Sequence, residues 1–269
     1  MRFQDAYFNI GYLDTLSYGN TFVHRLDPRI KLIVSLTFIL VVVSFPKYAL
    51  TGLLPFALYP IFLFAAGDIP VKPVIRKIVL LSPFIILVGI GNPLIDTGVQ
   101  FRMGAWGVSG GWISFLSIVI KFILTTSVAF LLIATSSFIG ICEGLQRLRV
   151  SDVFVIQMLF LYRYLFVLLE EAFSMMRARE ARSFGNKGYG IKPFINLVSV
   201  LLVRTLQKAE RIHGAMVSRG FQGRITTART RSITFPDLAF LVTALAVFAV
   251  LRFYDLPRAV GTFLMEVLQ

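Results

Sequence analysis

The alternation of apolar and polar segments along the chain predicts several membrane-spanning helices. Long apolar runs are separated by short segments that contain Gly, Pro or charged residues. Most runs approach the roughly 20 residues that a helix needs to cross a bilayer. The runs are Ile30–Phe45, Tyr48–Ala66, Ile78–Ile95, Ile113–Ile139 and Phe235–Leu251. The pattern therefore predicts an all-α integral membrane protein with about five transmembrane helices.

Local signals indicate where these helices begin, bend and end. Asp27 is placed to cap the first long helix, with Pro28 in its first turn. Pro83 and Pro93 predict kinks in the third run. The glycine-rich segment Asp96–Gly111 is expected to be a loop at the membrane interface, because tryptophans in and beside it favour that position.

Between residues 140 and 232 the chain changes character. This stretch holds fifteen of the 27 Lys and Arg residues but six of the 14 Asp and Glu residues. Its pattern predicts two long amphipathic helices, about 153–182 and 193–219, joined by the turn Gly185–Gly190 and preceded by a shorter amphipathic piece. We therefore divide the chain into residues 1–139 with four spans, 140–232 with the amphipathic helices, and 233–269 with the final span and tail.

The position of the positive charge predicts the orientation in the membrane. A net charge of +13 would favour nucleic-acid binding in a soluble chain. In a membrane protein it favours cytoplasmic loops beside anionic lipid, so no nucleic-acid partner is expected. The N-terminus and residues 140–232 are thus predicted to be cytoplasmic and the C-terminus to be outside. Val153–Leu169 is apolar enough for a further span, but Arg163 makes lipid exposure costly, and its depth stays open.

Residues for catalysis or metal binding do not cluster in the sequence. The aspartates are scattered, and Glu170 and Glu171 are adjacent, so they do not face each other on a helix. The two histidines, His24 and His213, have no neighbouring ligand, and Cys142 suits a small buried apolar residue. No phosphate-binding loop is present. We therefore expect no catalytic residue, no metal site and no bound cofactor in this chain.

A short motif is repeated at the ends of the two amphipathic helices. Each copy places an arginine between small residues and follows them with phenylalanine. The copies are Ala181-Arg182-Ser183 with Phe184, and Ser218-Arg219-Gly220 with Phe221. The small residues allow close approach of a partner, the rings offer apolar contacts, and arginine suits a bidentate grip on a carboxylate. Arginine at a helix C-terminus also complements the helix dipole, and that simpler explanation stays open here.

At these residues the sequence resembles the transmembrane T component of energy-coupling factor (ECF) ABC transporters, the EcfT/CbiQ family. The segments Leu26–Leu32 and Gly144–Arg149 resemble it as well. Ser183 and Ser218 depart from the family's Ala-Arg-Gly pattern, but both are small. The resemblance implies a non-catalytic scaffold with cytoplasmic coupling helices, docked through Arg182 and Arg219 to two ABC-type ATPase subunits that bind ATP and Mg. It also implies a membrane S component that holds the substrate, membrane lipid and an accessory membrane subunit as partners.

Within the family, the Arg-Gly-Phe ending resembles the cobalt/nickel branch, which serves cobalamin biosynthesis and related metal uptake. The resemblance therefore implies cobalt or nickel transport across a bacterial or archaeal inner membrane. A T component of a vitamin importer is the alternative. Two other classes stay open: a membrane-bound enzyme acting on lipids or prenyl groups, and a permease whose own helices form the pore.

Overall fold

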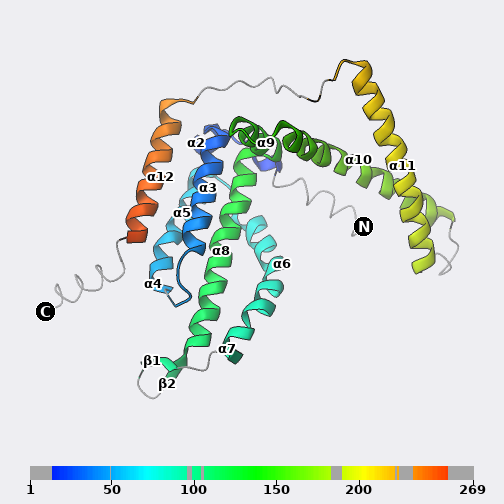
Figure 1. The fold of residues 1–269 in the computed structure, drawn as a ribbon. Helices are drawn as coiled ribbons and strands as arrows, with labels where there is room; N and C mark the ends of the chain where they lie inside the picture. The colour runs from blue at the N-terminus through cyan, green and yellow to red at the C-terminus, as the bar shows by residue number, and fades with distance from the viewer. Residues whose placement is uncertain are drawn as a thin grey trace. The chain divides into compact units, whose positions relative to one another are not determined.

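The computed structural model describes residues 14–48, 50–95, 99–103, 106–182, 190–221, 223 and 233–253. These residues form two compact units (Figure 1). The bundle unit comprises the described residues from 14 to 144 and from 233 to 253. The helix-pair unit comprises those from 145 to 223. Each unit is considered by itself below.

The bundle unit is built from helices and one small hairpin. Its helices are α2 (Phe22–Arg25), α3 (Pro28–Val43), α4 (Leu50–Leu53), η1 (Leu54–Ala57), α5 (Leu58–Gly67), α6 (Val71–Gly89), α7 (Gly91–Ile95), α8 (Gly110–Ser136), most of α9 (Phe138–Arg147) and α12 (Phe235–Phe253). The strands β1 (Val99–Met103) and β2 (Trp106–Ser109) pair antiparallel. The helix-pair unit contains α10 (Asp152–Arg182) and α11 (Ile191–Ser218).

The prediction of an all-α membrane protein is confirmed, with one local correction. Part of the predicted loop Asp96–Gly111 forms the β1–β2 hairpin, and α8 already begins at Gly110. In Val99–Met103, apolar and polar residues alternate with the period of two that is typical of a strand. The segment is so short that its glycines and polar residues favoured a loop interpretation.

Helix α6 begins earlier than its apolar run predicts. It starts at Val71, seven residues before Ile78, so Lys72, Arg76 and Lys77 lie in its first turns and not in a loop. Pro70 at the N-cap has extended backbone angles that mark the start of the helix. Pro83 lies inside α6 as predicted.

Within the described residues, five helical stretches are long and apolar enough to cross a membrane, which agrees with the predicted number and with a multi-pass membrane protein. They are Leu50–Gly67, Val71–Pro93, Gly110–Ser136, Asp152–Arg182 and Phe235–Phe253. Four of them match predicted spans. Helix α3, with 16 residues and a length of about 24 Å, falls short of the usual span length. Helix α10, whose depth was left open, meets the criteria of length and composition instead.

The core of the bundle unit surrounds α3. This helix packs against α8 on one side and α12 on another (Figure 1). The ring of Phe38 is fully buried, and its centroid lies 6.0 Å from that of Phe56, 5.0 Å from Tyr59 and 5.4 Å from Phe248. Tilted and edge-on aromatic pairs at these distances are favourable. This aromatic cluster joins α3, η1, α5 and α12.

The start of α3 is held by polar contacts in a mostly apolar unit. The predicted N-cap is confirmed, because the carboxylate of Asp27 accepts a hydrogen bond from the backbone N–H of Arg29 at 2.9 Å. Lys31 is buried, and its Nζ donates to the carbonyl oxygen of Thr135 at 2.7 Å. That carbonyl lies in the last turn of α8, where a positive charge complements the helix dipole.

His24 connects α2 to the segment before it. Its Nε2 lies 3.0 Å from the Leu16 carbonyl oxygen, which can only accept, so Nε2 carries the proton. In the neutral ring Nδ1 then accepts from the Thr21 hydroxyl at 2.7 Å. Burial, followed by the charge of Lys31, lowers the pKa of His24 below its ordinary value.

This shift predicts a loss of stability in mild acid. Above about pH 6.5, the ordinary histidine pKa, His24 is neutral in both the folded and the unfolded chain. As the pH falls below that value, the unfolded chain binds a proton that the folded chain does not, so folding becomes less favourable. We expect the unfolding temperature in detergent to fall between pH 7.5 and pH 5.5. His24→Gln should flatten this dependence; an unchanged slope in that variant would contradict the role of His24.

Candidate partner-docking site

The first copy of the repeated motif lies at the C-terminus of α10. Arg182 is the last residue of this 31-residue helix, and both Ala181 and Arg182 are exposed. Among the described residues, Arg182 forms no salt bridge. Ser183 and Phe184 lie outside the described residues, so their predicted roles stay predictions.

The second copy forms a complete helix-ending turn. Arg219 is the C-cap of α11, and Gly220 follows with a positive φ of 79°. The N–H of Phe221 donates to the carbonyl of Met216 at 3.0 Å, and the N–H of Gly220 donates to that of Val217 at 2.9 Å. This pair of bonds defines a Schellman motif, which usually requires glycine at the left-handed position. Gly220 therefore has a backbone role beside its predicted role in close approach.

The geometry leaves Arg219 free to meet a partner. Its side chain is exposed, and no described residue forms a salt bridge with it. Ser218 is also exposed, and its hydroxyl bonds back to the Gly214 carbonyl at 2.9 Å. The half-buried ring of Phe221 instead lies 6.5 Å from that of Phe160 in α10, so part of it packs within the unit. The predicted contact of Phe221 with a partner stays a prediction.

The two arginines stand at separate ends of the helix-pair unit. Phe221, two residues after Arg219, packs against Phe160 near the start of α10. Arg182 lies 22 positions further along the same helix, a distance of about 33 Å at ~1.5 Å per residue. A single small surface cannot contact both ends. The arrangement suits two separate binding surfaces.

An apolar groove runs between α10 and α11. Its volume is about 570 Å³. It is lined by Val153, Ile156, Gln157, Phe160, Tyr164, Val167, Leu168, Thr205, Leu206, Lys208, Ala209, Ile212, His213, Met216, Phe221 and Gly223. None of the residues of α11 is buried, and Ile191, for example, is 81% exposed. Sequence reasoning identified these helices as amphipathic but did not single out the groove-lining residues, although their spacing of three and four residues in α11 carries the signal.

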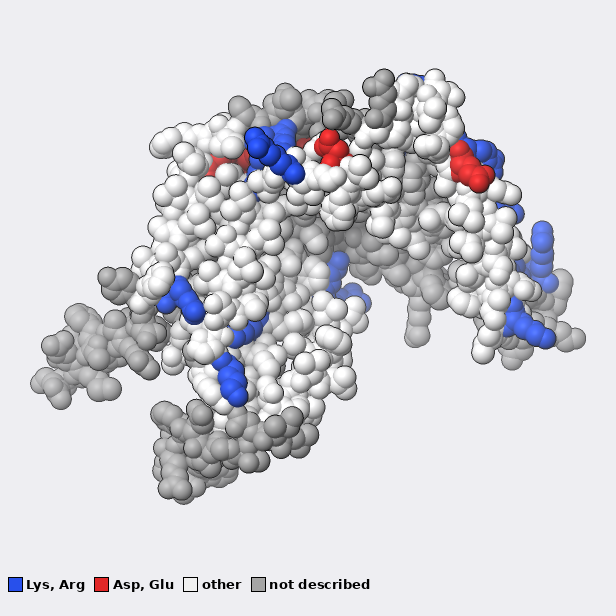
Figure 2. Space-filling model, viewed as in Figure 1, with Lys and Arg blue, Asp and Glu red and all other residues white. Residues whose placement is uncertain are grey.

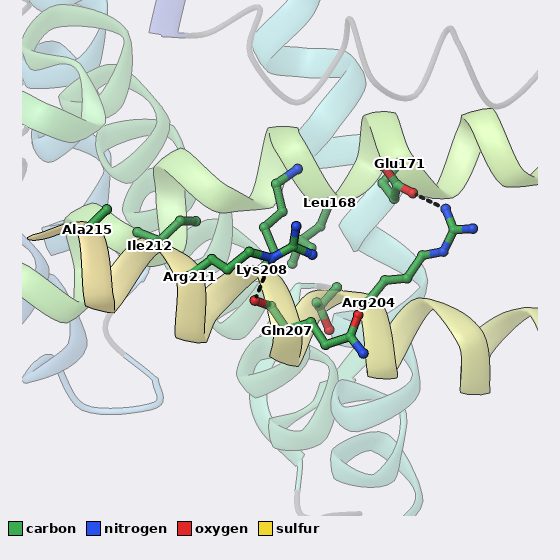
Figure 3. A pocket seen from close by; sticks show the side chains of 9 residues that line it. Leu168, Glu171, Arg204, Gln207, Lys208, Arg211, Ile212 and Ala215 are labelled. Carbon is green, nitrogen blue, oxygen red and sulfur yellow. Dashed lines mark hydrogen bonds and ion pairs between the residues drawn. The ribbon is translucent and has the colours of Figure 1, made fainter.

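A second, polar pocket lies beside the groove (Figure 3). Arg204 of α11 donates to the carboxylate of Glu171 of α10 at 2.7 Å, and Arg211 Nε donates to the Gln207 carbonyl at 3.3 Å. Lys208 lines the same pocket. Exposed ion pairs of this kind contribute at most about 1 kcal/mol, so this pair orients the two helices more than it stabilises them.

The surface of the bundle unit is different in character. On the face seen in Figure 2, most residues are uncharged, and several Lys and Arg side chains lie apart from one another.

The described residues show no grouping that suggests a metal site. No cluster of three or more His, Cys, Asp or Glu side chains occurs among them. Cys142 is fully buried as predicted, and burial raises the pKa of its thiol to about 11. A thiol with that pKa is a poor nucleophile at neutral pH.

Replacing Gly220 should loosen the end that presents Arg219. Gly220→Ala forces a side chain into a left-handed conformation, which costs about 1 kcal/mol. We expect faster amide hydrogen exchange at residues 216–221. Gly214→Ala is the matched control: it lies within α11 with no atom within 4 Å of the added methyl group, and alanine favours the helix by ~0.5–1 kcal/mol. Equal exchange in both variants would contradict the capping role.

Comparisons with known proteins cover most of this chain. The sequence model of the CbiQ family, described as "Cobalt transport protein", matches residues 19–230. A protein of Bacillus subtilis named energy-coupling factor transporter transmembrane protein EcfT is 28% identical over 258 residues, 87% of this chain and 94% of its own length. Its namesake in Streptococcus thermophilus is 30% identical over 227 residues, 76% of this chain and 83% of its own. The cobalt transport protein CbiQ of Rhodobacter capsulatus is 29% identical over 115 residues, 42% of this chain and 47% of its own.

Proposed function

Because the chain belongs to the CbiQ/EcfT family, the transmembrane T components of energy-coupling factor transporters, we propose that it is the scaffold that couples two cytoplasmic ABC-type ATPases to a substrate-binding S component. ATP and Mg bind to the ATPases in this scheme. The role of this chain is to transmit their motion to the membrane partner, and it performs no chemistry of its own.

The observation that carries this proposal is the placement of the two arginines. Each ends a long helix of the same unit, each is exposed, and about 33 Å of α10 separates the two ends. A guanidinium group can hold a carboxylate through two parallel hydrogen bonds, which fixes direction as well as strength. Arg182 and Arg219 thus each take a carboxylate on one ATPase. Ala181, Ser218 and Gly220 admit the partner surface closely.

The S component occupies the apolar surface of the helix-pair unit in this proposal. The groove between α10 and α11 is lined mainly by apolar residues such as Ile156, Phe160 and Leu206. Exposed apolar surface of this extent is rare on a protein without a partner or a membrane over it. An apolar helix of the S component would remove this apolar surface from water, which is favourable. Movement of the helix ends by the ATPases then reaches the S component through direct packing.

The charge distribution supports a topology with the N-terminus and the coupling helices in the cytoplasm and the C-terminus outside. The basic residues of region 140–232 stay on the cytoplasmic side under the positive-inside rule. The same residues attract anionic headgroups of the inner leaflet of a bacterial or archaeal cell membrane.

For the substrate we propose cobalt or nickel ion, carried by a dedicated S component. The family description names cobalt transport, and its match spans residues 19–230. A second candidate is a T component that serves vitamin importers. It is supported by coverage: the Bacillus subtilis relative named EcfT, whose name specifies no metal, aligns with 87% of this chain, against 42% for the Rhodobacter capsulatus relative named CbiQ. The bound substrate belongs to the S component in both cases, so this chain needs no ligands of its own.

Affinity purification from native membranes tests the proposal. The tagged chain should bring down two ATPase subunits and a small membrane protein, and the complex in proteoliposomes should import cobalt or nickel when ATP is supplied. Uptake of a labelled vitamin, with no uptake of metal, would support the second candidate. A chain that elutes alone and binds or modifies a substrate unaided would contradict the proposal and favour a permease or an enzyme.

A further inference from the structure

We infer that the turn Asp27-Pro28-Arg29 at the start of α3 is the anchor on which both connections to the helix-pair unit are held. This inference rests on the proposed function, because an anchor matters only if the helix-pair unit is moved. The chain leaves the bundle unit after Gly144 and returns to it at Arg231. The described residues just before the chain leaves the bundle unit, and those just after it returns, contact this one turn.

The outgoing connection packs on the turn through glycine. Gly140 and Gly144 lie four residues apart in α9, so they share one face of the helix. A methyl group on Gly144 would lie 3.3 Å from the Pro28 carbonyl carbon and 3.4 Å from the backbone nitrogen of Arg29. A methyl group on Gly140 would lie 3.7 Å from the Pro28 ring. Helix α9 therefore rests directly on the backbone of the turn just before the chain leaves the bundle unit.

The returning connection is bonded to the same turn by a carboxylate. Asp237 lies in the first turn of α12, and its Oδ2 accepts hydrogen bonds from both the backbone N–H and the hydroxyl of Thr234. The bond from the Thr234 N–H is the carboxylate half of a capping box, with aspartate in the usual place of glutamate. The Thr234 hydroxyl donates to the same oxygen, and the Asp237 N–H donates to the Thr234 backbone carbonyl. The other oxygen of Asp237, Oδ1, accepts from the backbone N–H of Asp27 at 2.9 Å. One carboxylate thus closes the start of α12 and ties it to the start of α3.

These contacts are shielded from water. Asp27 is 0% exposed and Asp237 is 1% exposed. Hydrogen bonds to a buried carboxylate are among the stronger polar interactions, and removing one partner leaves the other unsatisfied. The turn is therefore a rigid point of the bundle unit. Close backbone packing holds one connection to it, and a charge-assisted bond holds the other.

A common anchor has a mechanical consequence. When the ATPases move the ends of α10 and α11, the covalent connections transmit part of that force to the bundle unit. If both connections are fixed at one point, that force reaches the bundle unit there, and the motion of α10 and α11 acts on the S component. If the contacts of the turn are loosened, the connections change conformation and less of the motion reaches the S component. Asp237 and Gly144 are thus positioning residues for coupling, and they do not contact the ATPases or the substrate.

The test uses Asp237→Asn and Gly144→Ala in the full transporter complex. The carboxamide must direct its NH₂ group at a hydrogen-bond donor, either on Thr234 or on Asp27, so one of the bonds is lost. The alanine methyl group must displace the backbone of the turn by a few tenths of an ångström. We expect ATPases and S component to co-purify in normal amounts and ATP hydrolysis to continue within about twofold. Uptake should fall by about tenfold or more, in line with the loss of one buried charge-assisted bond.

Two matched controls lie in the bundle unit away from the turn. Asp68→Asn changes an exposed aspartate in the left-handed region, which asparagine tolerates. Gly91→Ala adds a methyl group with no atom within 4 Å. Both should retain uptake. If Asp237→Asn does not reach normal levels in the membrane, Thr234→Val replaces it as a test variant. This change removes the hydroxyl that donates to Asp237, at nearly constant side-chain volume.

The outcomes separate this inference from the proposed function. Uptake within twofold of the unmodified transporter in both test variants would overturn the anchor, and so would loss of the ATPases from the complex, since the turn would then serve assembly. Failure of the unmodified chain to bring down ATPases would instead overturn the proposed function. In that case hydrogen exchange on the purified chain still tests the anchor. Asp237→Asn should speed exchange at the Asp27 amide or at the Thr234 amide, whichever loses its acceptor, but not in α6. Unchanged exchange at both amides would overturn the anchor.

Discussion

Substituting alanine for both Arg182 and Arg219 should abolish uptake and release the ATPases, while the chain still inserts into the membrane. Each arginine ends a helix and is exposed, and neither forms a salt bridge to any described residue. Truncating either side chain should therefore leave the stability of the fold unchanged. Truncating one partner of a desolvated arginine–carboxylate pair costs roughly 2–5 kcal/mol. That weakens each contact by at least about 30-fold. The measurement is the amount of ATPase that co-purifies, followed by uptake in proteoliposomes.

Matched substitutions in the same helices separate this effect from a general loss of positive charge. Arg177→Ala in α10 and Arg211→Ala in α11 each remove one exposed arginine. Neither residue lies at a helix end, so both variants should bind ATPase and transport normally. The single variants Arg182→Ala and Arg219→Ala should each lose one docking contact. Normal uptake by the double variant would refute the docking role of the motif.

Phe38→Ala should be the most destabilising single substitution in the bundle unit. Phe38 is fully buried, and its ring contacts those of Phe56, Tyr59 and Phe248. Deleting it leaves a cavity that α3, α5 and α12 cannot close together. We expect a loss of about 3 kcal/mol, the low end for Phe→Ala, because in detergent or lipid the unfolded segment also has apolar surroundings.

Unfolding in a denaturing detergent, followed by near-ultraviolet circular dichroism, measures this loss. Phe84→Ala is the matched control, because the Phe84 ring in α6 is 70% exposed. The control should unfold within ~0.5 kcal/mol of the unmodified chain, as surface substitutions do. Equal destabilisation by both substitutions would show that the aromatic cluster adds nothing beyond general apolar contact.

The pattern of residues predicted the helices well where physical signals are local. The N-cap at Asp27, the end of α11 near residue 219 and the long helix ending at Arg182 follow from residue types within a few positions. The start of α6 was missed by seven residues, because charged residues in its first turns resemble a loop when apolarity alone is considered. The β1–β2 hairpin was missed because its strands, of five and four residues, are too short for their alternation to outweigh the glycines and polar residues around them.

Some features of the candidate site could be predicted from the sequence, and others could not. Duplication of small–Arg–small–Phe is visible in the sequence, and both arginines were singled out from it. That Phe221 packs against Phe160 depends on a neighbour some 60 residues away. No pattern within a single helix reports such a contact.

The sequence by itself determined the membrane class of this protein, its long amphipathic helices and the two arginines at their ends. Apolar runs, charge and capping residues act through local and additive free energies, so they can be read along the chain. The tertiary structure alone decided that Asp237 bonds to Asp27 and that Gly144 rests on Pro28. Asp27 and Asp237 are 210 positions apart, and only the packing of α3, α9 and α12 brings these groups within bonding distance.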